Sequence, residues 1–434
     1  MCILKAREEN FLGIFEHYGE HTTEDSWSSS SSTPHLPASK SRRIAIHPQI
    51  SRHEQNKMEF YTPRSKIGLE NLRSLNIFVG DANYGMTEEQ AIFIFKNFRL
   101  LRVLILDGVQ QYLRRLPEEI HNLIYLRYLG LRNTGVGNTG LKGEKKYFSL
   151  PASIGNLKKL HTLDLRNNGY FTRLPDVLWK LTRLRHLLVD DDRDYEHLRL
   201  QTLGHLETLK SVYAKNLIRE GAMQKLTNLR NIGIYFQETE EVGAVLNFSI
   251  FGWDRLRSLK MRILVSFSNL EPLSRCRQLT KLELGGAIPE YHNLGNLPPN
   301  LVRLILWDSA LKQDPMCILE KLQHLRFLSL ENNVYEGSEM VCSATGFPQL
   351  ETLTLKSFGL EQWEIEECAM PCLKSLSLSL EKLKMIPEGL RFLTTVRELK
   401  LIHMVTCEER VRGVNGVEGV DFYKVRHIPS ISFN

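Results

Sequence analysis

The sequence predicts an α/β solenoid, in which short parallel strands stack one above another. The first observation behind this prediction is a motif of aliphatic residues, spaced L-x-x-L-x-L, which occurs 14 times between Leu72 and Leu401. The 13 steps between successive copies average about 25 residues, which lies within the roughly 20–29 residues of a leucine-rich repeat. The second observation is a Leu-Pro or Ile-Pro unit in the second half of many repeats, as in Leu116-Pro117-Glu118-Glu119-Ile120.

The spacing of the leucines predicts how each repeat folds. Leucines at alternate positions place their side chains on one face of a short strand. One strand cannot bury that face alone, so the copies must stack into one parallel sheet over a continuous apolar core. We therefore expect a curved, horseshoe-shaped leucine-rich-repeat solenoid with the parallel sheet on its concave side.

The Leu-Pro units predict the convex side. Proline fixes φ and removes a backbone donor, which suits an irregular return segment where no ladder hydrogen bond is needed. The same pattern recurs at Leu150-Pro151, Leu174-Pro175 and Ile386-Pro387. We expect irregular or short helical segments there.

The two ends of the chain differ from the repeats. Residues 26–34 are rich in serine and read as a linker, and Arg42-Arg43-Ile44-Ala45-Ile46-His47 reads as a first, atypical strand. We expect residues 41–407 to form the repeat domain, with residues 408–434 as a tail that covers its end. The aromatic residues within Asp421–Pro429 are expected to cover the last repeat, because an uncapped solenoid end exposes core.

Composition limits the class of protein. A net charge of +6 is too small and too dispersed to indicate nucleic-acid binding. The charged N-terminal residues do not resemble a signal peptide, and the longest apolar-leaning run, Val242–Trp253, is too short to cross a bilayer. Seven scattered cysteines fit a reducing compartment. These features predict a cytoplasmic protein without a membrane span, and they leave open complexes at a membrane surface or in the nucleus.

No motif carries catalytic or metal chemistry. Gly135–Gly143 contains G-x-G-x-x-G, but a repeat strand precedes it and no helix is expected to follow it. Asp190, Asp192 and Asp194 have calcium-loop spacing without the required Gly and Glu. Cys368 and Cys372 form a lone C-x3-C pair, which we interpret as two half-buried thiols, and Glu361–Glu367 reads as a solvated face. We expect neither an enzyme nor a metal site.

The expected function is therefore binding, through strand residues on the concave side. Each strand offers three such positions: before the second leucine, between the paired leucines, and after them. Exposed aromatic residues beside Arg and Lys are typical of protein-binding surfaces. The candidate partner-binding residues are Tyr128, Arg132, Arg166, Tyr213, Lys215, Tyr235, Lys260, Arg262, Lys281, Arg303, Trp307, Phe327 and Lys356. Tyr213 and Lys215 depend on reading Leu209/Val212/Ala214 as one copy of the motif.

The chain resembles the C-terminal part of a plant intracellular immune receptor, a nucleotide-binding leucine-rich-repeat disease resistance protein of the coiled-coil class. Four features carry the resemblance: Leu4–Leu12, the Ser-rich linker with its atypical strand, the Leu-Pro-x-x-Ile units, and Asp421–Pro429, which is similar to the end of the downy-mildew-resistance-like group. The resemblance implies that residues 1–40 are the remnant of a preceding switch domain and the linker.

The resemblance also implies what the repeats do. In that family the repeats sense a pathogen effector or a guarded host protein and regulate a nucleotide-binding switch. The partner would be one of these proteins, or a nucleotide-binding domain of its own or another chain. No cofactor is expected here, because the family's ADP or ATP site would lie before Met1. The position of Met1 within a family segment suggests a truncated gene model, a splice product or a relic.

Three other functions remain open from the sequence. A substrate adaptor for ubiquitin ligation would need a helical F-box, for which residues 1–40 are short and Ser-rich. An intracellular scaffold of the Ras-related repeat type shares the Leu-Pro-x-x-Ile units but does not predict the two end segments. A non-functional receptor fragment would have the same sequence features as the receptor domain.

Overall fold

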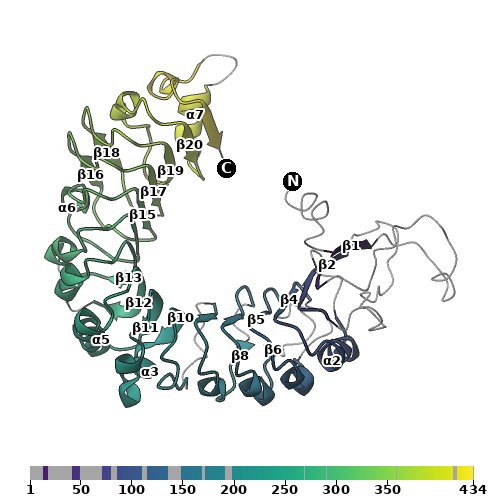
Figure 1. Cartoon of the computed structure of the whole chain (residues 1–434). Helices are drawn as coiled ribbons and strands as arrows, with labels where there is room; N and C mark the ends of the chain where they lie inside the picture. Colours follow the sequence, from purple (N-terminus) through teal and green to yellow (C-terminus); the bar gives the residue numbers. More distant parts are fainter. Residues whose placement is uncertain are drawn as a thin grey trace, which may run out of the picture. The chain divides into compact units, whose positions relative to one another are not determined.

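A computed structural model of the whole chain shows a succession of short parallel strands (Figure 1). The structure describes residues 13–17, 42–48, 71–79, 86–109, 115–134, 148–168, 172–190, 198–267, 269–289, 291–357, 359–413 and 418–433. The chain divides into two compact units. Unit 1 comprises residues 1–211 and 220–228, and unit 2 comprises residues 212–219 and 229–434.

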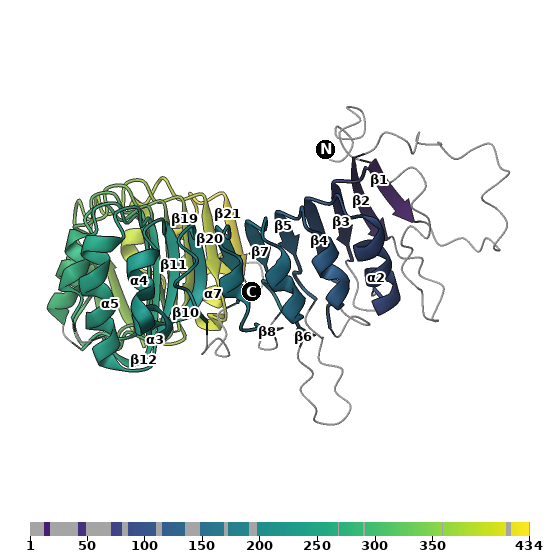
Figure 2. The same cartoon turned by 60° about the horizontal axis from the view of Figure 1, so that its bottom comes forward.

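Unit 1 contains the strands of the first repeats, paired in chain order and all parallel (Figure 2). They are β1 (Gly13–His17), β2 (Arg43–Pro48), β3 (Ser74–Phe78), β4 (Val103–Asp107), β5 (Tyr128–Gly130), β7 (Thr162–Asp164) and β9 (His186–Leu188), followed by β10 (Thr208–Tyr213), which runs into unit 2. A second, short ladder joins β6 (Phe148–Ser149) to β8 (Thr172–Arg173).

Unit 2 repeats the arrangement. Its main strands are β11 (Asn231–Phe236), β12 (Ser258–Ser266), β13 (Lys281–Ala287), β14 (Arg303–Trp307), β15 (Phe327–Glu331), β17 (Thr352–Lys356), β19 (Ser375–Ser379), β20 (Glu398–Leu401) and β21 (Ser430–Phe433). Each pairs in parallel with the next. A second ladder joins β16 (Glu339–Cys342) to β18 (Gln362–Ile365).

The segments that return between strands are short helices and turns. The longer helices are α2 (Glu88–Asn97), α5 (Thr239–Gly252) and α7 (Val405–Arg412), and the shorter ones are α3 (Ala214–Ile218), α4 (Ala222–Lys225) and α6 (Met316–Leu319). Single turns of 3-10 helix cover 118–122, 152–156, 178–180, 219–221, 271–275, 291–296, 388–392 and 422–424. Several follow a Leu-Pro or Ile-Pro unit directly, as Glu118–Asn122 follows Pro117. The prediction of an irregular, partly helical return is confirmed.

The leucines form the core, as the motif predicts. In β4 the side chains alternate between half-buried and buried, and Leu104 and Leu106 are fully buried. Their counterparts in β14, Leu304 and Leu306, are also fully buried. Full burial of one leucine side chain contributes about 1.5–3 kcal/mol to the free energy of folding. The leucine-rich-repeat fold is therefore confirmed.

The turns after the strands use asparagine. Asn133 and Asn167 both have positive φ, a conformation that Asn adopts more readily than most residues. The Asn168 side chain is buried and donates to the carbonyl oxygens of Leu131 and Leu165, both at 2.6 Å, while its own oxygen accepts from the Thr134 backbone at 2.6 Å. The Asn168 side chain thereby links two successive repeats, and both its amide nitrogen and its oxygen form hydrogen bonds although they are buried.

Both ends of the sheet hold strands that the motif does not predict. The strand predicted at Arg42–His47 exists as β2, but β1 pairs with it on its outer side, so β2 is not the first. The prediction of a linker and domain remnant before residue 41 did not anticipate this strand. At the other end, β21 adds a further strand to β20.

A charged cluster lies beneath the C-terminal segment. Asp421 is almost fully buried and accepts hydrogen bonds from Arg410 Nε at 2.7 Å and Nη2 at 3.2 Å. Lys424 Nζ contacts Asp421 at 3.0 Å and donates to the Ile386 carbonyl at 2.8 Å. The aromatic residues contribute less cover than expected, because Tyr423 is exposed and Val425 and Ile428 are the buried apolar residues.

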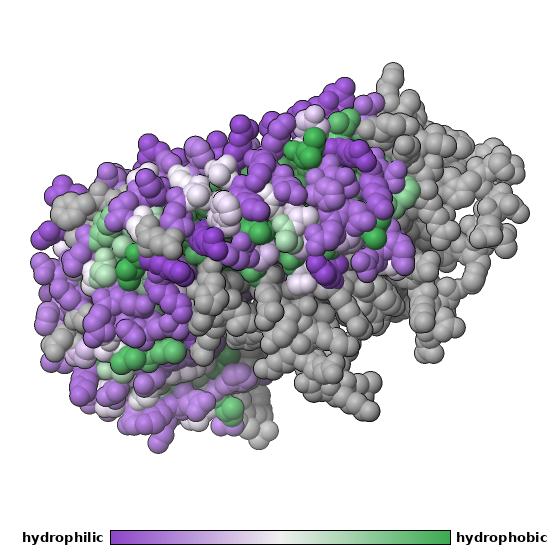
Figure 3. All heavy atoms as spheres, turned by 90° about the horizontal axis from the view of Figure 1, so that it is seen from below, coloured by the Kyte–Doolittle hydropathy of each residue, from purple (hydrophilic) through white to green (hydrophobic). Residues whose placement is uncertain are grey.

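None of the helices in the described part of the chain is long and apolar enough to cross a membrane. The molecular face drawn in Figure 3 is mostly hydrophilic, with small separate hydrophobic areas.

Burial distinguishes two cysteines from three exposed ones in the described part of the chain, which predicts their reactivity. Burial raises the pKa of Cys342 to about 12 and that of Cys407 to about 11, whereas Cys317, Cys368 and Cys372 are exposed. Because the thiolate is the nucleophile, we expect the exposed thiols to be alkylated in the folded protein and the two buried thiols only after denaturation. Mass spectrometry after timed iodoacetamide treatment checks this, and native labelling of Cys342 at the rate of Cys317 would contradict it.

The charged cluster predicts a pH dependence of the C-terminal segment. Burial alone would raise the pKa of Asp421, but the hydrogen bonds and charges of Arg410 and Lys424 outweigh burial and lower it. A group whose pKa is lowered on folding contributes stability that is complete above its unfolded pKa and is lost as pH falls through its folded pKa. We expect Asp421→Asn to destabilise the C-terminal segment by about 2 kcal/mol at neutral pH.

Hydrogen exchange of the β20 and β21 amides measures this effect at pH 7 and at acid pH. The difference between the wild type and Asp421→Asn should shrink as the carboxyl is protonated. Glu418→Gln is the control because Glu418 is exposed in the same segment, and an equal loss of protection in the control would contradict the assignment to Asp421.

Candidate functional site

The candidate surface is the face of the sheet opposite the buried leucines, which we call the open face. Each strand contributes an entry position before its second leucine, a middle position, and an exit position after the leucines. In β14 these positions are Arg303, Ile305 and Trp307, and all three are half-buried. Because the strands are paired in register, the positions form three rows across the sheet.

The exit row of unit 2 brings together aromatic and cationic side chains. Tyr235, Arg262, Gly285 and Trp307 are register partners on four successive strands. The Arg262 guanidinium carbon lies 5.9 Å from the centre of the Tyr235 ring. A cation at that distance is attracted by the ring and also loses part of its mobility.

A glycine makes room for the Trp307 ring. A Cβ atom at Gly285 would lie 2.0 Å from Trp307 Cε2, so the indole lies directly against this glycine. Lys260 Nζ, on β12, is 5.4 Å from the centre of the same ring. The indole therefore crosses the intervening strand, and a side chain at residue 285 would displace it. A glycine inside a strand is a sequence sign of such close approach, and the motif reading did not use it.

The entry row adds a third cation over an aromatic ring. Arg303 and Phe327 are register partners, and the guanidinium carbon of Arg303 lies 3.5 Å from the centre of the Phe327 ring. Lys281, the entry residue of β13, is exposed. In the middle row, Lys260 Nζ and Glu283 Oε2 are 3.8 Å apart. Lys356 is exposed at the exit of β17.

Two apolar side chains extend this surface. Strand β12 is longer than its neighbours, and its register with β13 shifts between Arg262 and Ser266. Leu264 and Val265, within the shifted segment, are 67% and 61% exposed. The motif reading missed both, because they lie beyond the three strand positions that it considers. Together with Arg262 they make the exit end of β12 partly apolar.

Tyr213 and Lys215 do not occupy the open-face positions that we expected. In β10, Leu209 is the register partner of Leu187, and Leu187 is the second leucine of the preceding repeat. Leu209 is therefore the second leucine of its own repeat and Leu206 the first. The motif that we expected, which began at Leu209, is displaced by three residues. Lys215 lies in helix α3, and Tyr213 is the buried last residue of β10. The physical reason is a left-handed turn at Ser211, with φ of 64°, which breaks the alternation.

The two residues nevertheless lie near the predicted surface. The ring centres of Tyr213 and Tyr235 are 6.2 Å apart, and Lys215 Nζ is 5.2 Å from the Tyr213 ring. Both belong to unit 2.

In unit 1 the predicted residues form a polar network around Asp164. Arg166 donates to this carboxylate through Nε at 2.8 Å and Nη2 at 2.7 Å, and Tyr128 donates to it at 3.2 Å. Arg132 pairs with Asp107 at 2.8 Å. Asp164 is fully buried, and these contacts satisfy it. Arg132 and Arg166 are therefore partly committed to their own carboxylates.

The network shifts the pKa values of its members. Burial alone would raise the pKa of Asp164, but the hydrogen bonds and charge of Arg166, with the charge of Arg132, lower it. Burial and the neighbouring Asp164 carboxylate raise the pKa of Tyr128. The cluster therefore stays ionised at Asp164 and protonated at Tyr128 at neutral pH, which fits a structural network more than proton transfer.

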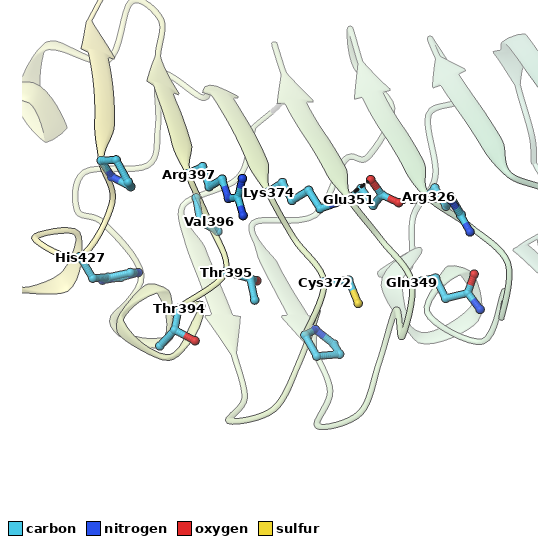
Figure 4. A pocket seen from close by; sticks show the side chains of 12 residues that line it. Arg326, Gln349, Glu351, Cys372, Lys374, Thr394, Thr395, Val396, Arg397 and His427 are labelled. Atoms are coloured by element: carbon cyan, nitrogen blue, oxygen red, sulfur yellow. Dashed lines mark hydrogen bonds and ion pairs between the residues drawn. The ribbon is translucent and has the colours of Figure 1, made fainter.

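A hollow of about 670 Å³ opens at the edge of unit 2 where strands begin (Figure 4). Arg326, Glu351, Lys374 and Arg397 line it from successive repeats. Glu351 contacts both Arg326, at 3.4 Å, and Lys374, at 2.8 Å. The charges on this edge therefore neutralise one another in part.

The described residues contain no group of three His, Cys, Asp or Glu side chains that could hold a metal ion. Cys368 and Cys372 are exposed, which corrects the expectation that these thiols are half-buried. The carboxylate of Asp190 accepts from the backbone of Asn167 and Asn168, and Asp192 and Asp194 lie outside the described residues, as does the glycine-rich segment 135–143. The charged residues of 361–367 are exposed, as predicted for a solvated face.

Comparison with known proteins agrees with the fold. The sequence model of the family described as "Leucine-rich repeat region" matches residues 71–421. The probable disease resistance RPP8-like protein 4 of Arabidopsis thaliana is 32% identical over 461 residues, which cover 100% of this chain and 45% of that protein. The disease resistance protein RPP8 of the same plant is 32% identical over 454 residues, with the same coverage. The chain thus spans less than half the length of these relatives.

Among solved structures, a leucine-rich-repeat protein of Leptospira interrogans matches with a TM-score of 0.54 and 17% sequence identity. The match covers 92% of this chain and 96% of that protein. At this identity the likeness concerns the fold alone.

The close contact at Gly285 predicts a variant that alters the candidate surface without touching its functional groups. In Gly285→Ala the new methyl group would overlap the Trp307 indole, so the indole must leave its position beside Lys260. We expect greater acrylamide quenching of Trp307, measured as the difference between each protein and its Trp307→Phe derivative. Gly295→Ala is the control, because no atom lies within 4 Å of a Cβ at that residue. Unchanged quenching in Gly285→Ala would show that the ring is not held there.

Proposed function

Because the chain belongs to the leucine-rich repeat region family, we propose that it works as a protein-recognition domain and not as an enzyme. The observation that carries the proposal is the unit 2 cluster, which we define as Tyr235, Lys260, Arg262, Arg303, Trp307 and Phe327. Their positions on adjacent strands and their ring–cation contacts support it.

The cluster has the chemistry of a binding hot spot. Trp, Tyr and Arg are the residues most enriched among those that dominate the energy of protein interfaces. Arg303 is held against Phe327 at 3.5 Å, so this pair loses less side-chain entropy on binding than free side chains would. Leu264 and Val265 supply exposed apolar area beside Arg262. The three cations of the cluster, Lys260, Arg262 and Arg303, favour a partner with acidic groups.

The proposed biological role follows from the relatives, which are disease resistance proteins of a plant. The domain senses a pathogen effector or a guarded host protein in the cytoplasm. It regulates a nucleotide-binding switch that belongs to a separate domain, and it binds no nucleotide or metal itself. Recognition through the middle strands of unit 2 is the part of this role that the geometry supports most directly.

The proposal is tested by truncating side chains of the unit 2 cluster in a protein that stays folded. We expect a chain with Lys260→Ala, Arg262→Ala, Arg303→Ala and Trp307→Ala to lose at least about 100-fold in affinity for its protein partner, since each hot-spot residue contributes about 1 kcal/mol or more. Partners are first found by proximity labelling in plant cells with the wild-type chain, and the affinities of purified partners are then measured by calorimetry.

A matched control removes the same kinds of side chain elsewhere in unit 2. It carries Arg277→Ala, Lys384→Ala, Arg391→Ala and Phe392→Ala, all at exposed positions outside the open face. Circular dichroism establishes that both variants are folded. Unchanged affinity in the cluster variant, or an equal loss in the control, would refute recognition through this cluster.

A further inference from the structure

A second charged surface lies along one edge of unit 1, and the open face does not include it. It is formed by the residue that follows the first leucine of each repeat. We define the basic edge as Arg73, Arg102, Arg127, His161 and Arg185. These residues precede the strands, so the motif positions that predict the open face do not include them.

Backbone hydrogen bonds hold the members of the basic edge side by side. The amide of Arg102 donates to the carbonyl of Arg73 at 2.7 Å, and that of Arg127 to Arg102 at 2.8 Å. The ladder continues from Arg127 to His161 and from His161 to Arg185, both at 2.8 Å. Adjacent members are therefore about one strand spacing apart, roughly 4.8 Å at the backbone.

The charges of the basic edge are not neutralised along most of its length. Within the described part of the chain, Arg73, Arg102 and Arg127 make no ion pair. Arg185 is 3.8 Å from Glu207, the carboxylate at the far end of the row. Burial, followed by the charges of Arg185, Arg127 and Arg183, lowers the pKa of His161, which is consistent with a positive field here.

The corresponding edge of unit 2 shows a different arrangement. There Glu351 stands between Arg326 and Lys374 and contacts both (Figure 4). The fold therefore accepts an acidic residue at this position of a repeat, and its carboxylate neutralises part of the charge of the two neighbouring cations. Unit 1 has no such residue between Arg73 and Arg185. Like charges held close together repel, so the row gains stability when a partner supplies carboxylates.

Exposed apolar side chains accompany the arginines. Leu100 lies two residues before Arg102 and is 39% exposed, while Ile124 and Tyr125, just before Arg127, are 53% and 40% exposed. Lys159 Nζ lies 4.2 Å from the centre of the Tyr125 ring. The edge therefore combines a line of cations with apolar side chains contributed by neighbouring repeats.

We propose that the basic edge docks an acidic segment of a partner protein, with apolar side chains interspersed among its carboxylates. Guanidinium groups match carboxylates in two parallel hydrogen bonds, and Leu100 and Ile124 would pack against aliphatic side chains. A single-stranded nucleic acid would need several exposed rings on which bases stack, whereas Tyr125 is the one exposed aromatic side chain among the described residues of unit 1. The inference extends the proposed recognition function to a second surface that shares no residue with the unit 2 cluster.

The experiment uses the full chain and a fluorescein-labelled 14-residue peptide in which Glu and Asp alternate with Leu and Phe. Fluorescence anisotropy measures its affinity. We expect binding that weakens about tenfold between 50 and 300 mM salt, because exposed charges are screened. Arg73→Ala, Arg102→Ala and Arg127→Ala together should weaken it at least about 30-fold. A peptide with Lys in place of the acidic residues should not bind.

Two further variants separate the contribution of the charges to peptide binding from that of the apolar side chains. Arg127→Glu copies the arrangement at Glu351, and it should fold normally and weaken peptide binding at least about tenfold. Leu100→Ser, Ile124→Ser and Tyr125→Ser together should weaken the binding of the apolar-containing peptide, with little effect on a peptide of Glu and Ser. Arg277→Ala, Lys312→Ala and Lys321→Ala, exposed positions of unit 2, give the same change of net charge and should bind like the wild type.

Equal affinity in the basic-edge variant and in this charge control would overturn the proposal. Tighter binding of phosphatidylserine vesicles or of a single-stranded oligonucleotide than of the acidic peptide would also overturn it, and would assign the edge to that ligand. The unit 2 cluster variant tests the proposed function separately, because it leaves the basic edge intact. A loss of affinity for the protein partner in that variant concerns the unit 2 cluster and not the basic edge.

Discussion

Each strand of this protein has a row of leucines on one face that its own repeat cannot cover. Leu104 and Leu106 become fully buried because the strands before and after β4 lie in register with it. Side chains of a strand alternate with a period of two, so parallel pairing without a one-residue slip keeps the leucines of every strand on the same side. The turns with Asn at positive φ, the short returning helices and the covering segment at the C-terminal end all serve this stacking.

The same constraint creates the surfaces that can bind. Fixing the leucines inward turns the alternate residues outward, and the register then aligns them in rows. In unit 2 the rows bring cations over aromatic rings, and Gly285 leaves room for an indole to cross a strand. In unit 1 similar positions hold Arg132 and Arg166 in pairs with buried or half-buried carboxylates. One repeat pattern therefore supports a network of ion pairs and hydrogen bonds in one unit and cations stacked on aromatic rings in the other.

The interruption of the pattern is as informative as its regularity. At β10 a left-handed Ser211 ends the alternation, helix α3 follows within the next few residues, and the division between the two compact units lies at the same place. The sequence reading assigned Leu209, Val212 and Ala214 to one copy of the motif because their aliphatic spacing fits, but Val212 lies near the end of β10 and Ala214 begins helix α3. Aliphatic spacing does not distinguish a buried strand from a short buried helix, so only contacts with neighbouring repeats decide between them.

The sequence by itself determined the repeat, its period, the inward leucines and most of the outward residues, because a period-two strand and a stacked core allow one solution. It also predicted Tyr128, Tyr235, Arg262, Arg303 and Trp307 as candidate binding residues on the open face. Only the tertiary structure decided which of these side chains stack against a ring or a cation and which form a hydrogen bond. Those contacts join residues more than 20 positions apart in the sequence. The tertiary structure also decided the end strands β1 and β21 and the displaced register at β10, because pairing with a neighbour can impose a strand where the local sequence carries no motif.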